Sequence, residues 1–170
     1  MLGSVDRSPP ESFESFCSSR FHALTLQIYA FTGDLGEVQD LVQEAFCRAY
    51  ARWSTVQHYE NPVAWVRRVA WNLATSRWRR LRTAASFLQG QRVQHVAAPS
   101  ADRVDLTWAL KRLPEAQRRI FVLFHVADLP LQEIAEQEQV ALGTVKSTLS
   151  RARAAVAPML SEQQEGSSRV

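Results

Sequence analysis

The chain has 170 residues, enough for one domain or for two small ones with modest cores. Its apolar content of 46% and its charged content of 22% are ordinary for a soluble globular protein. The formal charge of +3 is too small to indicate a polyanionic partner by itself. No apolar run could span a bilayer, and the N-terminus lacks the basic-then-apolar order of a signal peptide, so we expect a cytoplasmic protein without membrane insertion.

The residues that usually carry catalysis or bind metals form no recognisable pattern. Cys17 and Cys47 fit a reducing compartment and lack the spacing of zinc ligands. The four histidines are scattered, and neither a Ser, His and Asp arrangement nor a pair of carboxylates indicates catalysis. We therefore expect no metal, no cofactor and no enzymatic activity.

The first predicted helix begins at Glu11. Its apolar residues recur at spacings of three and four, and they are Phe13, Cys17, Phe21, Leu24, Ile28 and Phe31. Cys17 is therefore expected in the core and not as a reactive thiol. Gly33 breaks the pattern, and Asp34 is suited to cap the next helix.

The second predicted helix is amphipathic. Its apolar stripe consists of Leu35, Val38, Val42, Ala45, Phe46, Ala49 and Trp53. The opposite face carries Glu37, Asp40, Gln43, Glu44 and Cys47. The plain interpretation of such a polar face is a solvated surface.

A polar loop over residues 54–61 precedes Pro62 and a third helix over residues 63–82. One side of that helix carries Trp65, Val66, Val69, Ala70 and Leu73. The other side carries Arg67, Trp71, Thr75 and Trp78, flanked by Arg68, Asn72 and Arg79. Tryptophans that share a face with arginines fit two interpretations: burial against the other half of the protein, or a platform on which unpaired bases stack.

Residues 83–101 have weak periodicity and are predicted to be a flexible linker. A second domain follows, in which Pro114 opens a helix and the tail after Pro158 is expected to fray. Two short apolar blocks at helical spacing then predict a helix-turn-helix; they are Leu131, Ile134 and Ala135, and Val145, Leu149 and Ala152.

The second helix of this unit carries side chains that can donate to bases or phosphates: Thr144, Lys146, Ser147, Thr148, Ser150, Arg151 and Arg153. In a helix-turn-helix such residues enter the major groove of duplex DNA. A helical hairpin with a solvated basic face is the alternative.

The second domain combines several motifs, which are residues 110–118, Glu133-Ile134-Ala135, residues 143–147 and Arg151-Ala152-Arg153. In these motifs it resembles the promoter-reading domain of bacterial sigma factors of the extracytoplasmic-function group. Three positions depart from the family: Glu138-Gln139 replace a usual Leu-Gly, Thr148 replaces a common Arg, and Pro130 replaces a Ser or Thr cap. The resemblance implies contacts with the −35 element of promoters.

The first half resembles two further parts of the same family. Gly33-Asp34, residues 38–46 and Arg48-Ala49 are similar to the helix that docks on core RNA polymerase, which implies contacts from Asp40, Gln43, Glu44 and Cys47. Residues 61–65, Arg68, residues 72–74 and Arg79-Arg80 are similar to the element that melts and reads the −10 hexamer. There the preceding loop, here His58, Tyr59, Glu60 and Asn61, captures a flipped base. Trp71, Ser76 and Trp78 replace the usual Arg, Asp and Leu, so the base preference does not carry over.

The sequence thus predicts an all-α protein of two small helical domains, at residues 11–82 and 102–160. The resemblance implies a sigma factor with core RNA polymerase and promoter DNA as partners, duplex at −35 and single-stranded at −10, and it allows an anti-sigma factor as well. A regulator that uses only the helix-turn-helix is the main alternative, and a pure protein-interaction bundle or an anti-sigma antagonist is another. The block over residues 61–80 favours the sigma factor. Whether the two domains pack together is left open.

Overall fold

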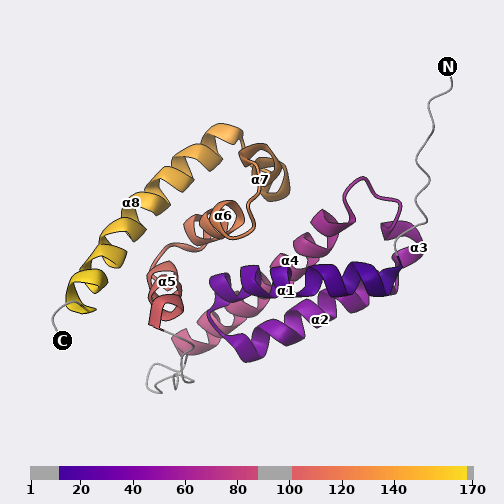
Figure 1. The fold of residues 1–170 in the computed structure, drawn as a ribbon, viewed down its shortest axis with the longest axis horizontal. Helices are drawn as coiled ribbons and strands as arrows, with labels where there is room; N and C mark the ends of the chain where they lie inside the picture. Colours follow the sequence, from indigo (N-terminus) through magenta and orange to yellow (C-terminus); the bar gives the residue numbers. More distant parts are fainter. Residues whose placement is uncertain (1–11, 88–100, 168–170) are drawn as a thin grey trace.

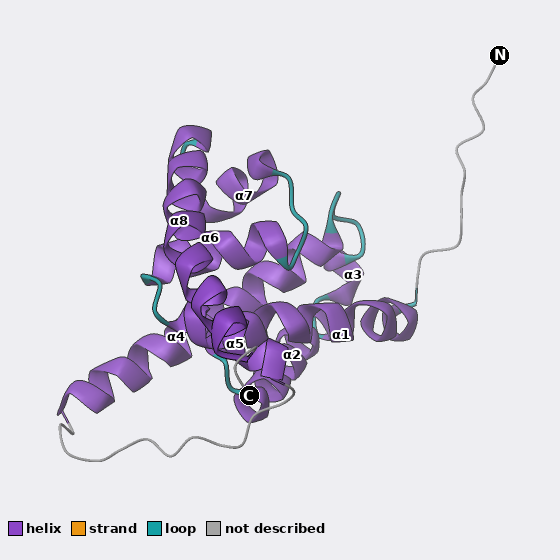
Figure 2. Cartoon of the chain, turned by 60° about the vertical axis from the view of Figure 1, so that its left-hand side comes forward, coloured by secondary structure: helices purple, strands orange, loops and turns teal. Residues whose placement is uncertain are grey.

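The computed structural model describes residues 12–87 and 101–167, which form eight helices and no strand (Figures 1 and 2). Their bounds are α1 Phe13–Thr32, α2 Leu35–Tyr50, α3 Trp53–Val56, α4 Pro62–Phe87, α5 Ala101–Lys111, α6 Glu115–His125, α7 Leu131–Glu138 and α8 Leu142–Ser167. The predicted all-α class is confirmed. The predicted helix start at Glu11 lies outside the described residues.

The boundaries of α1 and α2 follow from local chemistry. Ser12 caps α1 by accepting a hydrogen bond from the Ser15 amide at 3.2 Å. Gly33 ends that helix in the left-handed region at φ 69°, where a side chain would be strained. Asp34 then caps α2, because its Oδ1 accepts from the Glu37 amide at 3.2 Å. The predicted break and cap are both confirmed.

The apolar stripe of α2 forms the core of the first domain. Val38, Val42, Ala45 and Ala49 are fully buried against α1 and α4. Leu35 differs from the prediction, since its side chain is 51% exposed. It is the first residue of α2, and the neighbouring helices do not cover that end.

Two helices are longer than expected. α4 continues to Phe87 and so includes the first part of the segment predicted to be a linker. Residues 88–100 of that segment lie outside the described residues, and its last residue, Ala101, begins α5. α8 continues through Pro158 to Ser167, where fraying was expected, and so accommodates one residue without an amide donor.

α7 and α8 form the predicted helix-turn-helix. The turn depends on Gln139, which adopts left-handed dihedrals with φ 56°. The Val140 amide donates to the Ala135 carbonyl at 3.1 Å and so closes the end of α7. Pro130 stands at the start of α7 and does not cap it with its side chain, because a proline ring has no hydrogen-bond acceptor.

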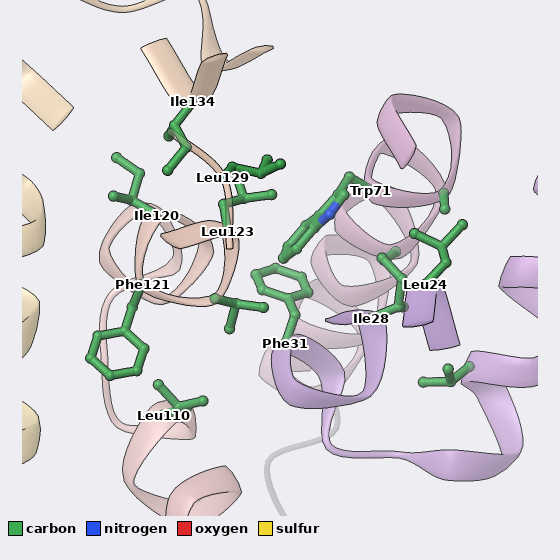
Figure 3. Packing of buried hydrophobic residues seen from close by; sticks show 14 of the residues in the cluster. Leu24, Ile28, Phe31, Trp71, Leu110, Ile120, Phe121, Leu123, Leu129 and Ile134 are labelled. Atoms are coloured by element: carbon green, nitrogen blue, oxygen red, sulfur yellow. The ribbon is translucent and has the colours of Figure 1, made fainter. Parts of the chain in front are cut away.

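The two domains pack on each other, which answers the question that the sequence left open. Trp71 of α4 is fully buried, and its ring centroid lies 4.9 Å from that of Phe31. Figure 3 shows both rings turned toward the second domain, where Leu123 and Leu129 lie. The buried residues of the two domains therefore form one continuous cluster (Figure 3).

Gln139→Gly is expected to stabilise the protein by up to about 1 kcal/mol, because a residue other than glycine pays about 1–2 kcal/mol in left-handed dihedrals. Chemical denaturation followed by circular dichroism measures the change. Ala154→Gly, at an exposed position of α8, is the matched control and should destabilise by about 1 kcal/mol. If Gln139→Gly unfolded at a lower denaturant concentration than the wild type, the left-handed backbone at Gln139 would not be strained.

Candidate protein and nucleic-acid interfaces

The polar face of α2 lies on the surface of the first domain. Asp40, Gln43, Glu44 and Cys47 are all exposed, while the opposite side of the helix is held in the core. Glu44 pairs with Arg48 one turn later at 2.8 Å, with both side chains about half exposed. The predicted set is therefore brought together on one open, acidic surface.

An apolar side chain that the sequence analysis did not single out borders this surface. Tyr50 ends α2 with 68% of its surface exposed, and its ring centroid lies 5.0 Å from that of Phe13. Tyr50 follows Cys47 by three residues, so helical spacing alone could have placed it on the same face of α2. An acidic face with an exposed aromatic residue at its end is more typical of a protein interface than of a plain solvated surface.

The two cysteines differ in their surroundings. Cys17 packs against the core from α1, and burial raises the pKa of its thiol, with the nearby Cys47 as a smaller cause. A raised pKa keeps the thiol protonated and poorly nucleophilic. This environment agrees with the expected core role of Cys17.

The loop before α4 presents its side chains to solvent. His58, Tyr59, Glu60 and Asn61 are all exposed. Asn61 also has a structural role, because its Oδ1 accepts from the Ala64 amide at 2.9 Å and caps the first turn of α4. The remaining three side chains are free to meet a ligand in front of α4.

The predicted DNA-reading face of α4 is only partly accessible. Arg68, Asn72 and Arg79 are exposed and Trp78 is half-buried. Arg67, Trp71 and Thr75 are buried, with exposures of 6%, 0% and 6%. Of the two interpretations that the sequence left open for this face, burial against the other half of the protein holds for these three residues in this arrangement, because the second domain covers them.

Side chains of α6 and α7 hold the buried part of α4. Arg67 donates from Nε to Gln137 Oε1 at 2.9 Å and forms an ion pair with Glu133. The Arg119 guanidinium donates to Thr75 Oγ1 at 3.0 Å. The second domain thus occupies donors and acceptors that the sequence had assigned to DNA.

The second domain also contacts α4 at positions further along the helix. Arg119 lies over the Trp71 ring, 5.3 Å from its centroid. Arg79 pairs with Glu115 of α6 at 3.0 Å, although most of the arginine remains exposed.

An open cleft of 540 Å³ lies between the start of α4 and α7. Residues of both domains line it, among them Glu60, Arg68 and Glu136.

On α8 most of the predicted DNA-contacting residues are exposed. They are Thr144, Lys146, Ser147, Ser150, Arg151 and Arg153. Thr148 differs, because it is only 7% exposed and turns toward the rest of the domain. Its side chain is therefore not available to DNA here, and burial explains why an uncharged residue suits this position.

Arg153 is held against α6, whereas Arg151 donates from Nε to a carbonyl of its own helix, that of Ser147, at 3.3 Å. Arg153 donates from Nε to His125 Nε2 at 3.1 Å and lies over the Phe124 ring. Loss of hydration lowers the pKa of His125, and the charge of Arg153 lowers it further. The imidazole is therefore neutral at pH 7 and able to accept this hydrogen bond.

Two negative findings concern the described residues alone. They contain no group of three His, Cys, Asp or Glu side chains that could hold a metal ion. None of their helices has the length and apolar character needed to cross a membrane.

Family models match both halves of the chain. The model described as sigma-70 region 2 covers residues 22–84, and the one described as sigma-70 region 4 covers residues 103–156. The first match spans the exposed face of α2 and most of α4. The second spans the helix-turn-helix.

Individual relatives agree with the family models. The RNA polymerase sigma-E factor of Streptomyces coelicolor is 34% identical over 145 residues, which cover 84% of this chain and 82% of that protein. The ECF RNA polymerase sigma factor SigW of Bacillus subtilis is 28% identical over 149 residues, covering 78% and 80%.

Solved structures share the arrangement of helices. The sigma factor RpoE from Bartonella quintana, solved in complex with the anti-sigma factor NepR, has a TM-score of 0.76 and 25% identity, covering 88% of this chain and 96% of that one. CnrH, solved with the cytosolic domain of CnrY, has a TM-score of 0.65 at 20% identity and supports the fold. The chain belongs to the sigma-70 family, in its extracytoplasmic-function group, and is a sigma factor that directs promoter-specific transcription initiation by RNA polymerase.

Proposed function

We propose that the exposed face of α2 is the surface that docks on core RNA polymerase. Asp40, Gln43 and Glu44 supply polar contacts, Cys47 lies among them, and Tyr50 adds an apolar contact at the end of the helix. The observation that carries this assignment is that α2 buries one side completely and leaves an acidic side open. Charges at the edge of an interface steer association and set specificity.

Promoter reading is divided between the two domains. Thr144, Lys146, Ser147, Ser150 and Arg151 of α8 contact the duplex −35 element from the major groove. The loop over residues 58–61, together with Arg68, Asn72 and Arg79, receives the melted −10 strand. Flipping a base out of the stack costs a few kcal/mol, which capture in a protein pocket offsets.

The buried residues of α4 join this site only after the domains separate. Arg67, Trp71 and Thr75, together with the half-buried Trp78, then form the platform on which an unpaired base stacks, with the arginines along the backbone. Thr148 supports α8 from its buried side, and Arg153 reaches DNA by leaving His125.

The family acts with polymerase in the cytoplasm as a regulatory subunit, and we propose the same for this chain. A regulator that uses only the helix-turn-helix would leave the region 2 match over residues 22–84 without a role. RpoE of Bartonella quintana was solved with an anti-sigma factor, and we propose a partner of that kind here too.

Reversing two charges tests the docking surface. Asp40→Lys with Glu44→Lys should weaken binding of core polymerase by at least about tenfold, which corresponds to about 1.4 kcal/mol, because two attractive contacts become repulsive. Fluorescence anisotropy of the labelled protein titrated with core enzyme measures the affinity.

The control for this variant is Asp128→Lys with Glu136→Lys, which makes the same change in net charge at exposed sites of the second domain. It should leave core affinity unchanged. Equal affinity of the docking variant and the control would reject the assignment of α2.

Removing two cations from α8 tests the −35 contacts. Lys146→Ala with Arg151→Ala should lower the affinity of the holoenzyme for promoter fragments and reduce the slope of log K against log salt by about 2, roughly one unit per lost phosphate contact. Filter binding at several salt concentrations measures both quantities.

Arg20→Ala with Arg112→Ala removes the same charge from exposed positions outside α8 and is the matched control. Its salt slope should equal that of the wild type. If the α8 variant kept the wild-type slope, Lys146 and Arg151 would not contact phosphates.

A further inference from the structure

The two cysteines of the chain lie on neighbouring helices. Cys17 belongs to α1 and Cys47 belongs to α2, and both are free thiols. A short turn at Gly33 and Asp34 joins these helices, which pack against each other (Figure 1). Two helices joined in this way run antiparallel, so residues near the start of α1 lie opposite residues near the end of α2.

An aromatic contact fixes the register of this helix pair. The ring centroids of Phe13 and Tyr50 lie 5.0 Å apart. In an antiparallel pair, one turn forward in one helix and one turn back in the other lead to residues that again lie opposite each other. Cys17 is one turn after Phe13, and Cys47 is one turn before Tyr50. The register therefore places the two thiols across from each other.

A second aromatic contact brackets the cysteines from the other side. The ring centroid of Phe21, one turn after Cys17, lies 5.8 Å from that of Phe46, the residue before Cys47. The two thiols also interact electrostatically. Burial raises the pKa of Cys17, and a negative charge on Cys47 raises it further, which requires the two side chains to be near each other.

The spacing of packed helices suits a disulfide at this place. Helix axes in contact are about 8–10 Å apart, and Cα atoms lie about 2.3 Å from their axis. Facing Cα atoms are thus about 3.5–5.5 Å apart at the centre of a contact and farther apart toward its edge. Disulfides join Cα atoms about 4.4–6.8 Å apart. The half-buried Cys17 and the exposed Cys47 lie toward the edge of the contact, where this range is met.

We infer that Cys17 and Cys47 form a redox-sensitive pair, which closes to a disulfide beside the docking face of α2 and weakens binding to core RNA polymerase. The oxidant is a low-molecular-weight disulfide. The effect on polymerase rests on the proposed docking role of α2. Disulfides in a reducing compartment are usually transient and serve redox sensing, and two cysteines without the spacing of zinc ligands fit that use.

The unequal exposure of the thiols sets the order of the steps. The thiolate of the exposed Cys47 attacks one sulfur of the small disulfide, forms a mixed disulfide and releases one small thiolate. The thiolate of Cys17 then attacks the Cys47 sulfur and releases the second. The protons of both cysteines end on the leaving thiolates, so the protein loses two electrons and the small disulfide gains them. Cys17 is a poor nucleophile, but its partner is held beside it.

The disulfide changes the docking face at two points. Cys47 lies one turn after Glu44 on that face and one turn before Tyr50. The new bond turns the Cys47 sulfur toward α1, so that it no longer faces a partner. It also draws α1 and α2 together where the exposed Tyr50 ring packs on Phe13, so the ring has to move. Displacing an aromatic contact from an interface lowers affinity.

Peptide mapping by mass spectrometry tests the cysteine pair. The protein is incubated with oxidised glutathione, which is then removed. The wild type should lose two hydrogen atoms and yield a peptide cross-linked between Cys17 and Cys47, with little glutathione attached. Accumulation of a glutathione adduct on Cys47 in the wild type would mean that the two thiols do not meet, and it would overturn the inference.

Two single variants separate the roles of the thiols. Cys17→Ala leaves Cys47 without a partner, so the glutathione adduct that the wild type resolves should accumulate. Cys47→Ser removes the accessible thiol, and Cys17 should then react at least about tenfold more slowly than Cys47 does in the other variant. Equal rates would contradict the assigned order of the two steps.

Core binding tests the consequence of the disulfide. Protein labelled at its N-terminus is titrated with core polymerase in reduced and oxidised form, after removal of the oxidant, and fluorescence anisotropy gives the affinity. The oxidised form should bind at least about threefold more weakly, and prior treatment with dithiothreitol should restore the affinity. Equal affinities of the cross-linked and reduced forms would overturn the redox control. Charge reversal at Asp40 and Glu44 tests the docking assignment separately, because it involves neither cysteine.

Discussion

The packing of α4 on both of its sides is the constraint on which the rest of the structure depends. Val66, Ala70 and Ala74 are buried on this helix, which packs against α1 and α2, while Trp71 meets Phe31 and the second domain (Figure 3). A helix that is apolar on more than one face must be covered on more than one face. The second domain, whose α5 and α6 also pack on α1, therefore covers a face of α4 that the first domain leaves open. This cover divides the residues that we propose to read DNA into exposed and buried sets.

Much of the fold could be predicted because the relevant information is local. The glycine break at Gly33, the cap at Asp34 and the exposed face with Asp40 and Glu44 each depend on residues within one or two helical turns. The error at Leu35 came from the end of a helix, where periodicity continues but neighbouring helices do not. Periodicity shows which side of a helix is apolar, but it does not show how much of that side the neighbouring helices cover.

The contact between the domains could not be predicted because it joins residues far apart in the chain. Trp71 on a face with arginines fitted two interpretations, and both use the same chemistry. A ring that stacks on a base also packs against Phe31 or under the guanidinium of Arg119. Thr148 is a similar case, since it suits either a polar surface or the edge of a core, and only the packing of α8 decides.

If Arg67 and Arg79 bind DNA as we propose, this shared chemistry makes the packed arrangement and that contact exclude each other. Glu133 and Glu115 offer carboxylates to Arg67 and Arg79, and a guanidinium binds carboxylate and phosphate with the same paired geometry. The second domain thus holds these two arginines with carboxylates, which phosphates would replace in the proposed DNA contact. The domain that we propose to recognise the upstream element therefore also contacts residues that we propose to receive the melted strand.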